Sequence, residues 1–83
     1  MMPGGSEDGA ALPASVRSLA MLGCAMAMRR EEQIAPLTAE CLDAGATRDA
    51  VREVVRMAIV MTECPGERYR ALVEQAIDSF ESQ

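Results

Sequence analysis

The sequence predicts an all-α fold of about four helices in one domain over residues 12–83, preceded by a disordered tail over residues 1–11. Its 83 residues are 49% hydrophobic but only 2% aromatic, and a composition rich in alanine and methionine favours helices over strands. Apolar residues recur at helical spacing in four segments, which glycine or proline separates. A chain this short buries a small core, so association of several copies is the expected source of further stability.

The first predicted element is a helix over residues 13–28. Pro13 suits the first turn of a helix. Residues 19–28 (LAMLGCAMAM) carry no charge, and a helix that is apolar all round is buried on more than one side. In a subunit of this size we expect the second side to face another copy. Cys24, in the middle of this segment, is expected to be an inert core residue.

The second helix has one predicted end and two possible starts. It ends at Ala44, because Gly45 suits the left-handed position that follows a helix. Pro36 lacks an N–H to donate to the preceding turn, and its ring clashes with the carbonyl four residues back, so proline fits best in the first turn of a helix. The helix therefore starts near Ala35, with the proline in its first turn, or near Arg30, with the proline inside.

The third helix is predicted over residues 48–62 and the fourth over residues 67–81. Thr47 is a suitable N-cap for the third, and Pro65-Gly66 separates the two. The inner face of the third comprises Val51, Val54, Val55, Ala58 and either Met61 or Thr62. The fourth carries a continuous apolar stripe of Tyr69, Leu72, Val73, Ala76, Ile77 and Phe80.

Charge and composition exclude several functions. The formal net charge is −5, every cation is an arginine and there is no histidine, so we expect no nucleic-acid partner, no metal and no cofactor. No segment is apolar over the length of a membrane span. Cys24, Cys41 and Cys64 form no CxxC pair, and no signal peptide is apparent. We therefore expect the protein to be cytoplasmic and its three cysteines to be free thiols.

Residues 39–71 (AECLDAGATRDAVREVVRMAIVMTECPGERYRA) carry three features in a fixed order. A Gly-Ala-Thr end of a helix is followed by the run DAVREVVRMA, and then by a proline eighteen residues after Thr47. This order resembles the alkylhydroperoxidase-like, or carboxymuconolactone decarboxylase, family. The segment RSLAMLGCAMAM is similar to the family's first helix, so the resemblance extends over residues 16–80.

The resemblance implies positions for a redox site. In the family's peroxidases a CxxC pair starts the active-site helix, a histidine follows one turn later, and a glutamate lies on the preceding helix. Counting back from Gly45 places the cysteines at Arg30 and Gln33, the histidine at Leu37 and the glutamate near Ser18. None of the four residues matches, so the peroxidase activity is not transferred.

Other residues could still support chemistry. The family's decarboxylases act on anionic lactones, and Arg29, Arg30 and Glu32 could bind and protonate such a substrate, although a solvated charged turn is the favoured explanation of these residues. Cys41 and Cys64 are the candidate thiols for a peroxidase. Neither sits in surroundings that favour a thiolate, since Cys41 is mid-helix beside acids and Cys64 follows a helix C-terminus.

These observations predict a degenerate member of the family, acting as a binding or structural oligomer without thiol redox chemistry. The alternative is an enzyme of the same family, either a thiol peroxidase or a decarboxylase-like protein. The resemblance implies a homotrimer or homohexamer. The methionines of the helices are expected to fill gaps in the core or at an interface; they are Met21, Met26, Met28, Met57 and Met61.

Overall fold

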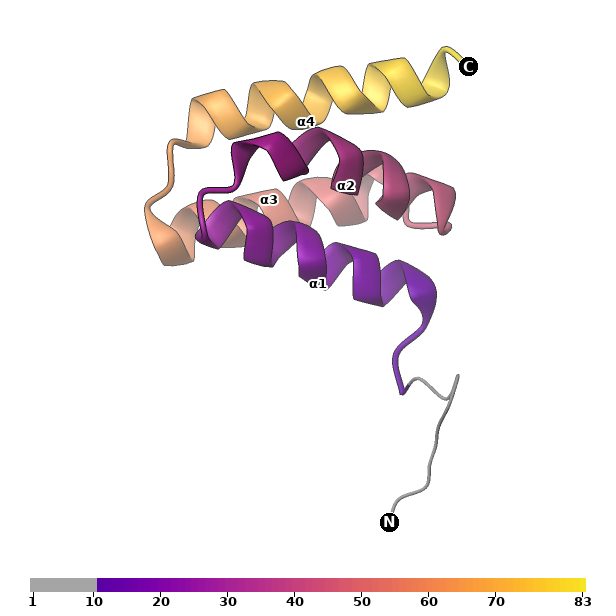
Figure 1. Ribbon diagram of the computed structural model, residues 1–83, viewed down its shortest axis with the longest axis horizontal. Coiled ribbons are helices and arrows are strands. Elements are labelled where there is room, and N and C mark those ends of the chain that lie inside the picture. The colour runs from indigo at the N-terminus through magenta and orange to yellow at the C-terminus, as the bar shows by residue number, and fades with distance from the viewer. Residues whose placement is uncertain (1–10) are drawn as a thin grey trace.

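Four helices form the part of the chain that the computed structural model describes, residues 11–83 (Figure 1). They are α1 (Ala14–Ala27), α2 (Glu31–Asp43), α3 (Arg48–Thr62) and α4 (Gly66–Glu81). This part contains no strand, so the predicted all-α fold is confirmed. Apart from Ala11, the expected tail lies outside the described residues.

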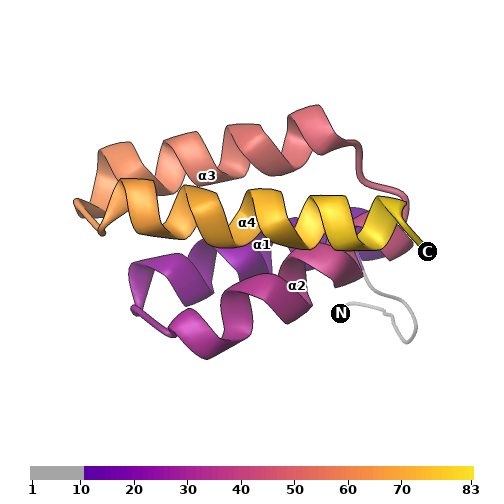
Figure 2. The same cartoon turned by 90° about the horizontal axis from the view of Figure 1, so that it is seen from above.

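The helices form an antiparallel bundle in which consecutive helices run in opposite directions (Figure 1). Helix α1 packs against α2 and α3, whereas α4 packs mainly against α2 and only sparsely against α3. Seen from above, α3 and α2 flank the line of α4 and α1 (Figure 2). The α1–α2 and α3–α4 turns therefore lie at the same end of the bundle.

The turn between α2 and α3 forms as predicted. Gly45 has a φ of 104°, in the left-handed region. The N–H groups of Ala46 and Gly45 donate to the carbonyls of Cys41 and Leu42 at 2.9 and 3.0 Å, which is the hydrogen-bond pattern of a Schellman motif. The hydroxyl of Thr47 then accepts from the N–H of Ala50 at 3.0 Å and caps α3.

Helix α2 takes the earlier of its two predicted starts, with Pro36 inside the helix. The N–H of Gln33 donates to the carbonyl of Arg30 at 2.9 Å and closes the first turn. Proline cannot donate to the carbonyl four residues back, which belongs to Glu32. Because Glu32 is exposed, water can satisfy that carbonyl and the proline is tolerated.

The core lies where all four helices meet. Its fully buried side chains come from each helix: Leu22, Met26, Ile34, Thr38, Cys41, Val51, Tyr69, Val73 and Ile77. Of the two alternatives on α3, Thr62 is partly buried, whereas Met61 is 79% exposed. Cys64 is also buried, in the short segment between α3 and α4.

The expectation that Cys24 is a core residue was wrong, because its side chain is exposed. The buried stripe of α1 comprises Ser18, Leu22, Ala25 and Met26, and Cys24 lies on the other side of the helix. Met26 is buried as predicted. The other methionines named above, Met21, Met28, Met57 and Met61, are exposed.

Candidate functional site

A cavity of about 250 Å³ opens between α1 and the start of α2. Its lining residues are Met21, Cys24, Ala25, Met28, Arg30, Gln33 and Leu37. The arginine supplies the only formal charge among them, and the glutamine supplies an amide. The remaining wall is apolar apart from the thiol of Cys24. The cavity can therefore hold a small ligand that has an apolar body and one polar or anionic group.

Three of the four positions that match the family's redox site meet in this cavity. Arg30 precedes α2, Gln33 lies in its first turn, and Leu37 follows one turn later, so all three face α1. Ser18, the position of the glutamate, is buried on α1 and is not among the lining residues. The fold thus brings the cysteine and histidine positions together, although other side chains occupy them.

The structure separates the three residues considered for an anionic lactone. Arg30 lines the cavity. The Nη2 of Arg29 instead donates to the carbonyl oxygen of Thr62, at the end of α3, over 3.2 Å. Glu32 is exposed and does not line the cavity. Only Arg30 of the three is therefore placed to meet a ligand there.

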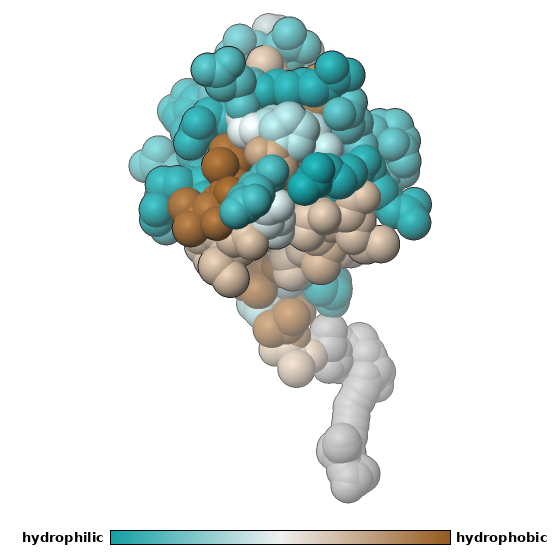
Figure 3. All heavy atoms as spheres, turned by 90° about the vertical axis from the view of Figure 1, so that its left-hand side faces the viewer, coloured by the Kyte–Doolittle hydropathy of each residue, from teal (hydrophilic) through white to brown (hydrophobic). Residues whose placement is uncertain are grey.

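The backbone of Arg29 has a φ of 62°, which few non-glycine residues adopt. The N–H groups of Arg29 and Arg30 donate to the carbonyls of Met26 and Ala25 at 3.1 and 2.9 Å, so that α1 also ends in a Schellman motif. This turn sets the direction in which Arg30 enters α2. Figure 3 views this end of the bundle, where hydrophilic side chains cover the upper part and hydrophobic ones gather at mid-height and below.

The two thiols considered for catalysis lie outside the cavity. Cys41 is fully buried in the core, and this burial, with the charge of Glu40, raises the pKa of its thiol to about 11. The predicted direction of this shift is confirmed. Cys64 is 6% exposed and lies in the turn between α3 and α4. Neither side chain can meet a ligand without movement of the surrounding core.

Cys24 is the functional candidate that the sequence analysis missed. Among the three free cysteines it alone is exposed, and it lines the same cavity as Arg30. The position of Cys24 around the helix could have shown that its side chain lies off the buried face. The buried residues of α1, which are Ser18, Leu22, Ala25 and Met26, share one face of the helix, and position 24 falls outside that face.

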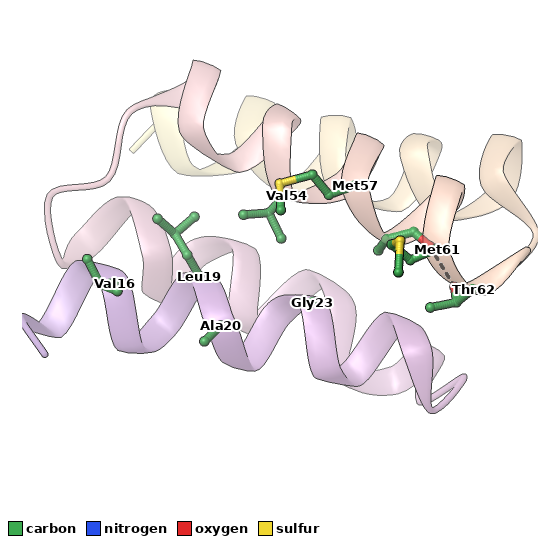
Figure 4. Close-up of a pocket in the computed structure, with 9 residues that line it drawn as sticks. Val16, Leu19, Ala20, Gly23, Val54, Met57, Met61 and Thr62 are labelled. Atoms are coloured by element: carbon green, nitrogen blue, oxygen red, sulfur yellow. Dashed lines mark hydrogen bonds between the residues drawn. The ribbon is translucent and has the colours of Figure 1, made fainter.

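A second and larger groove, of about 440 Å³, runs between α1 and α3 (Figure 4). Val16 and Leu19 point from α1 toward α3, and Met61 points from α3 toward α1. The lining is almost wholly apolar: Val16, Leu19, Ala20, Gly23, Val54, Met57, Ala58, Met61 and Thr62. An open apolar groove of this kind is a candidate surface for association with another molecule.

Within residues 11–83, no group of three or more His, Cys, Asp or Glu side chains is arranged to hold a metal ion. None of the four helices combines the length and apolar character needed to cross a membrane.

Comparison with known proteins identifies the family. The carboxymuconolactone decarboxylase family model matches residues 4–76. Because the match covers most of the 83 residues, the chain belongs to the carboxymuconolactone decarboxylase family. Comparisons with curated proteins and with solved structures gave no match.

Proposed function

We propose that this chain is a family member that keeps the helical frame without the dithiol centre, and that it acts as a binding or structural homo-oligomer in the cytoplasm. One observation carries the proposal. The α1–α2 cavity presents Arg30, Gln33 and Leu37 at the positions of the family's two cysteines and histidine. These side chains can bind a ligand, but they cannot exchange electrons with a peroxide.

Dithiol chemistry requires two thiols in contact, one of them as a thiolate. The cavity contains one thiol, that of Cys24. Cys41 has a pKa of about 11, so only about one molecule in ten thousand carries its thiolate at neutral pH. Burial of Cys64 keeps it from both peroxide and reductant. These placements support the absence of a peroxidase cycle.

The alternative is an enzyme of the same family. A peroxidase using Cys41 or Cys64 has little support from their burial. A decarboxylase-like activity on an anionic lactone has one supporting observation, which is the position of Arg30 in the wall of the cavity. No carboxyl group lines that cavity to act as a general acid beside it.

The proposed oligomer is supported by the α1–α3 groove. Met57 and Met61 are 53% and 79% exposed there, and the opposite wall on α1 is equally apolar. A second copy of the chain would remove this surface from water, which is favourable in proportion to the apolar area buried. A homotrimer or homohexamer, as the family resemblance implies, would cover it in every subunit.

Turnover assays test the proposal against the enzymatic alternative. The protein is incubated in catalytic amount with hydrogen peroxide and a dithiol, and separately with an anionic lactone such as a muconolactone. We expect neither reaction to exceed the rate without protein. Peroxide consumption that is lost in Cys41→Ser or Cys64→Ser would establish the peroxidase. Lactone turnover lost in Arg30→Gln would establish the decarboxylase-like enzyme.

A further inference from the structure

A third concave surface lies between α3 and α4, on a different pair of helices from the α1–α2 cavity. Its volume is about 240 Å³, and it is lined by Arg52, Val55, Arg56, Arg70, Val73 and Glu74. Three of the chain's eight cations thus meet in one small groove, although the chain carries a formal net charge of −5. Such a concentration of arginines in an acidic protein calls for an explanation beyond solubility.

One of the three arginines is fixed by an ion pair within the groove. The Nε and Nη2 of Arg52 donate to the two carboxylate oxygens of Glu74 at 2.8 and 2.9 Å. This hydrogen bonding holds the pKa of Glu74 below its ordinary value, so the carboxylate stays charged at neutral pH. The pair balances its own charge and links α3 to α4 at the groove.

The other two arginines are available to a ligand. Arg56 pairs with Glu53 on the same helix, and both side chains are more than half exposed; such pairs are weak and are readily exchanged for a better partner. Glu53 does not line the groove. Arg70 forms no hydrogen bond or ion pair within residues 11–83.

The floor of the groove is apolar. Val55 and Val73 lie there and are 3% and 1% exposed. The volume is smaller than the roughly 300–1,000 Å³ of pockets for drug-sized ligands, so an occupant must be small. Guanidinium groups present paired donors that match the oxygens of a phosphate or a carboxylate.

We propose that the α3–α4 groove binds a small organic oxyanion with two negative charges, its anionic group held by Arg56 and Arg70 and its apolar body lying against the aliphatic stems of the arginines above Val55 and Val73. Arg52, whose charge Glu74 balances, bounds the groove without contributing a free positive charge. This site is independent of the function proposed for the α1–α2 cavity, since the two share no residue.

Calorimetric titration tests the site with three probes at constant ionic strength and mildly alkaline pH. Phenyl phosphate and phthalate are both dianions under these conditions and distinguish a phosphate site from a dicarboxylate site. Benzamide supplies a similar ring without charge. We expect saturable binding of at least one dianion and none of benzamide.

Two arginine variants localise the binding. Arg70→Gln should lower the affinity of the protein for the dianion about tenfold, which is the effect of losing a charged hydrogen bond. Arg68→Gln is the matched control, because it removes the same charge from the same helix but its side chain pairs with Glu31 outside the groove. Helical content, measured by circular dichroism, should be unchanged in both exposed-site variants.

Three results would overturn the proposal. The first is an absence of saturable binding by both dianions. The second is equal weakening by Arg70→Gln and Arg68→Gln, which would indicate general attraction to surface charge. The third is binding of benzamide as tight as that of the dianions, which would show that the groove selects an apolar ring and no anion.

Discussion

The backbone N–H of Gln33 donates to the carbonyl oxygen of Arg30 at 2.9 Å, and this bond closes the first turn of α2 around the two positions of the family's cysteine pair. Thiols placed here would lie one turn apart at a helix N-terminus, where the helix dipole lowers a thiol pKa. The backbone arrangement of a dithiol site is thus present. The side chains at the two cysteine positions are instead the cation of Arg30 and the amide of Gln33.

Restoring the site therefore requires more than two cysteines. We expect a variant combining Arg30→Cys, Gln33→Cys and Leu37→His to stay inactive as a peroxidase, because it lacks a carboxylate to relay the proton. Adding Ser18→Glu should be the first change that gives measurable turnover. Peroxide-dependent oxidation of a dithiol compares the two variants, and equal turnover in both would contradict the requirement for the relay.

The three thiols should differ sharply in accessibility. A disulfide reagent added to the native protein is expected to modify Cys24 first, because Cys24 is exposed while Cys41 and Cys64 are buried. The other two should react only when the protein unfolds. Peptide mass mapping after timed labelling gives the order. Modification of Cys41 as fast as that of Cys24 would contradict the packing of the core.

Stability should fall at alkaline pH because of Cys41. Its thiol pKa is about 11 in the folded protein, above its ordinary value of 9.0, so the folded state holds the proton more tightly than the unfolded state. The contribution is fully present below pH 9 and is lost as the pH rises from about 9 to about 11. We expect a loss of up to about 3 kcal/mol.

Urea unfolding at a series of pH values measures this effect. Cys41→Ala is the control, since it removes the titrating thiol. It should reduce the dependence of the unfolding free energy on pH, whatever the smaller side chain costs in stability at neutral pH. Tyr69 titrates with the same sign, because burial followed by the charge of Glu31 raises its pKa. Part of the slope should therefore remain in Cys41→Ala, and an unchanged slope would refute the assignment to Cys41.

Assembly should depend on the α1–α3 groove. The protein is expected to sediment as a homo-oligomer at micromolar concentration, and Met61→Glu should shift it toward the monomer by placing a charge in the apolar groove. Val60→Glu is the matched control, because Val60 is 67% exposed but does not line the groove. A stable wild-type monomer, or dissociation by both variants alike, would exclude this groove as the interface.

Much of the fold follows from local sequence signals. Gly45 and Thr47 encode the end of α2 and the start of α3, because a left-handed residue and a side-chain acceptor act within a few residues of their own position. The start of α2 could not be chosen in this way. Whether Pro36 is tolerated inside a helix depends on solvent at the Glu32 carbonyl, and that is a property of the whole bundle.

The candidate site was predicted less completely. The family resemblance, counted back from Gly45 along one helix, implies the positions Arg30, Gln33 and Leu37, and the structure places all three at one cavity. Cys24 was assigned to the core because its whole segment is apolar, which hides the difference between the packed and the open side of α1. The α3–α4 groove is lined by residues from two helices, so no pattern within one segment of the sequence indicates it.

The proposed absence of a redox-active pair of thiols can be tested from the intact mass of the protein after one exposure to stoichiometric hydrogen peroxide, because the result does not depend on which reductant is supplied. The reaction is quenched by alkylation under denaturing, non-reducing conditions. We expect that no two cysteines lose their hydrogens to a disulfide, and that any oxidation of cysteine adds oxygen to Cys24 alone. Rapid loss of two hydrogens and of two alkylation sites would show a working dithiol and refute this proposal.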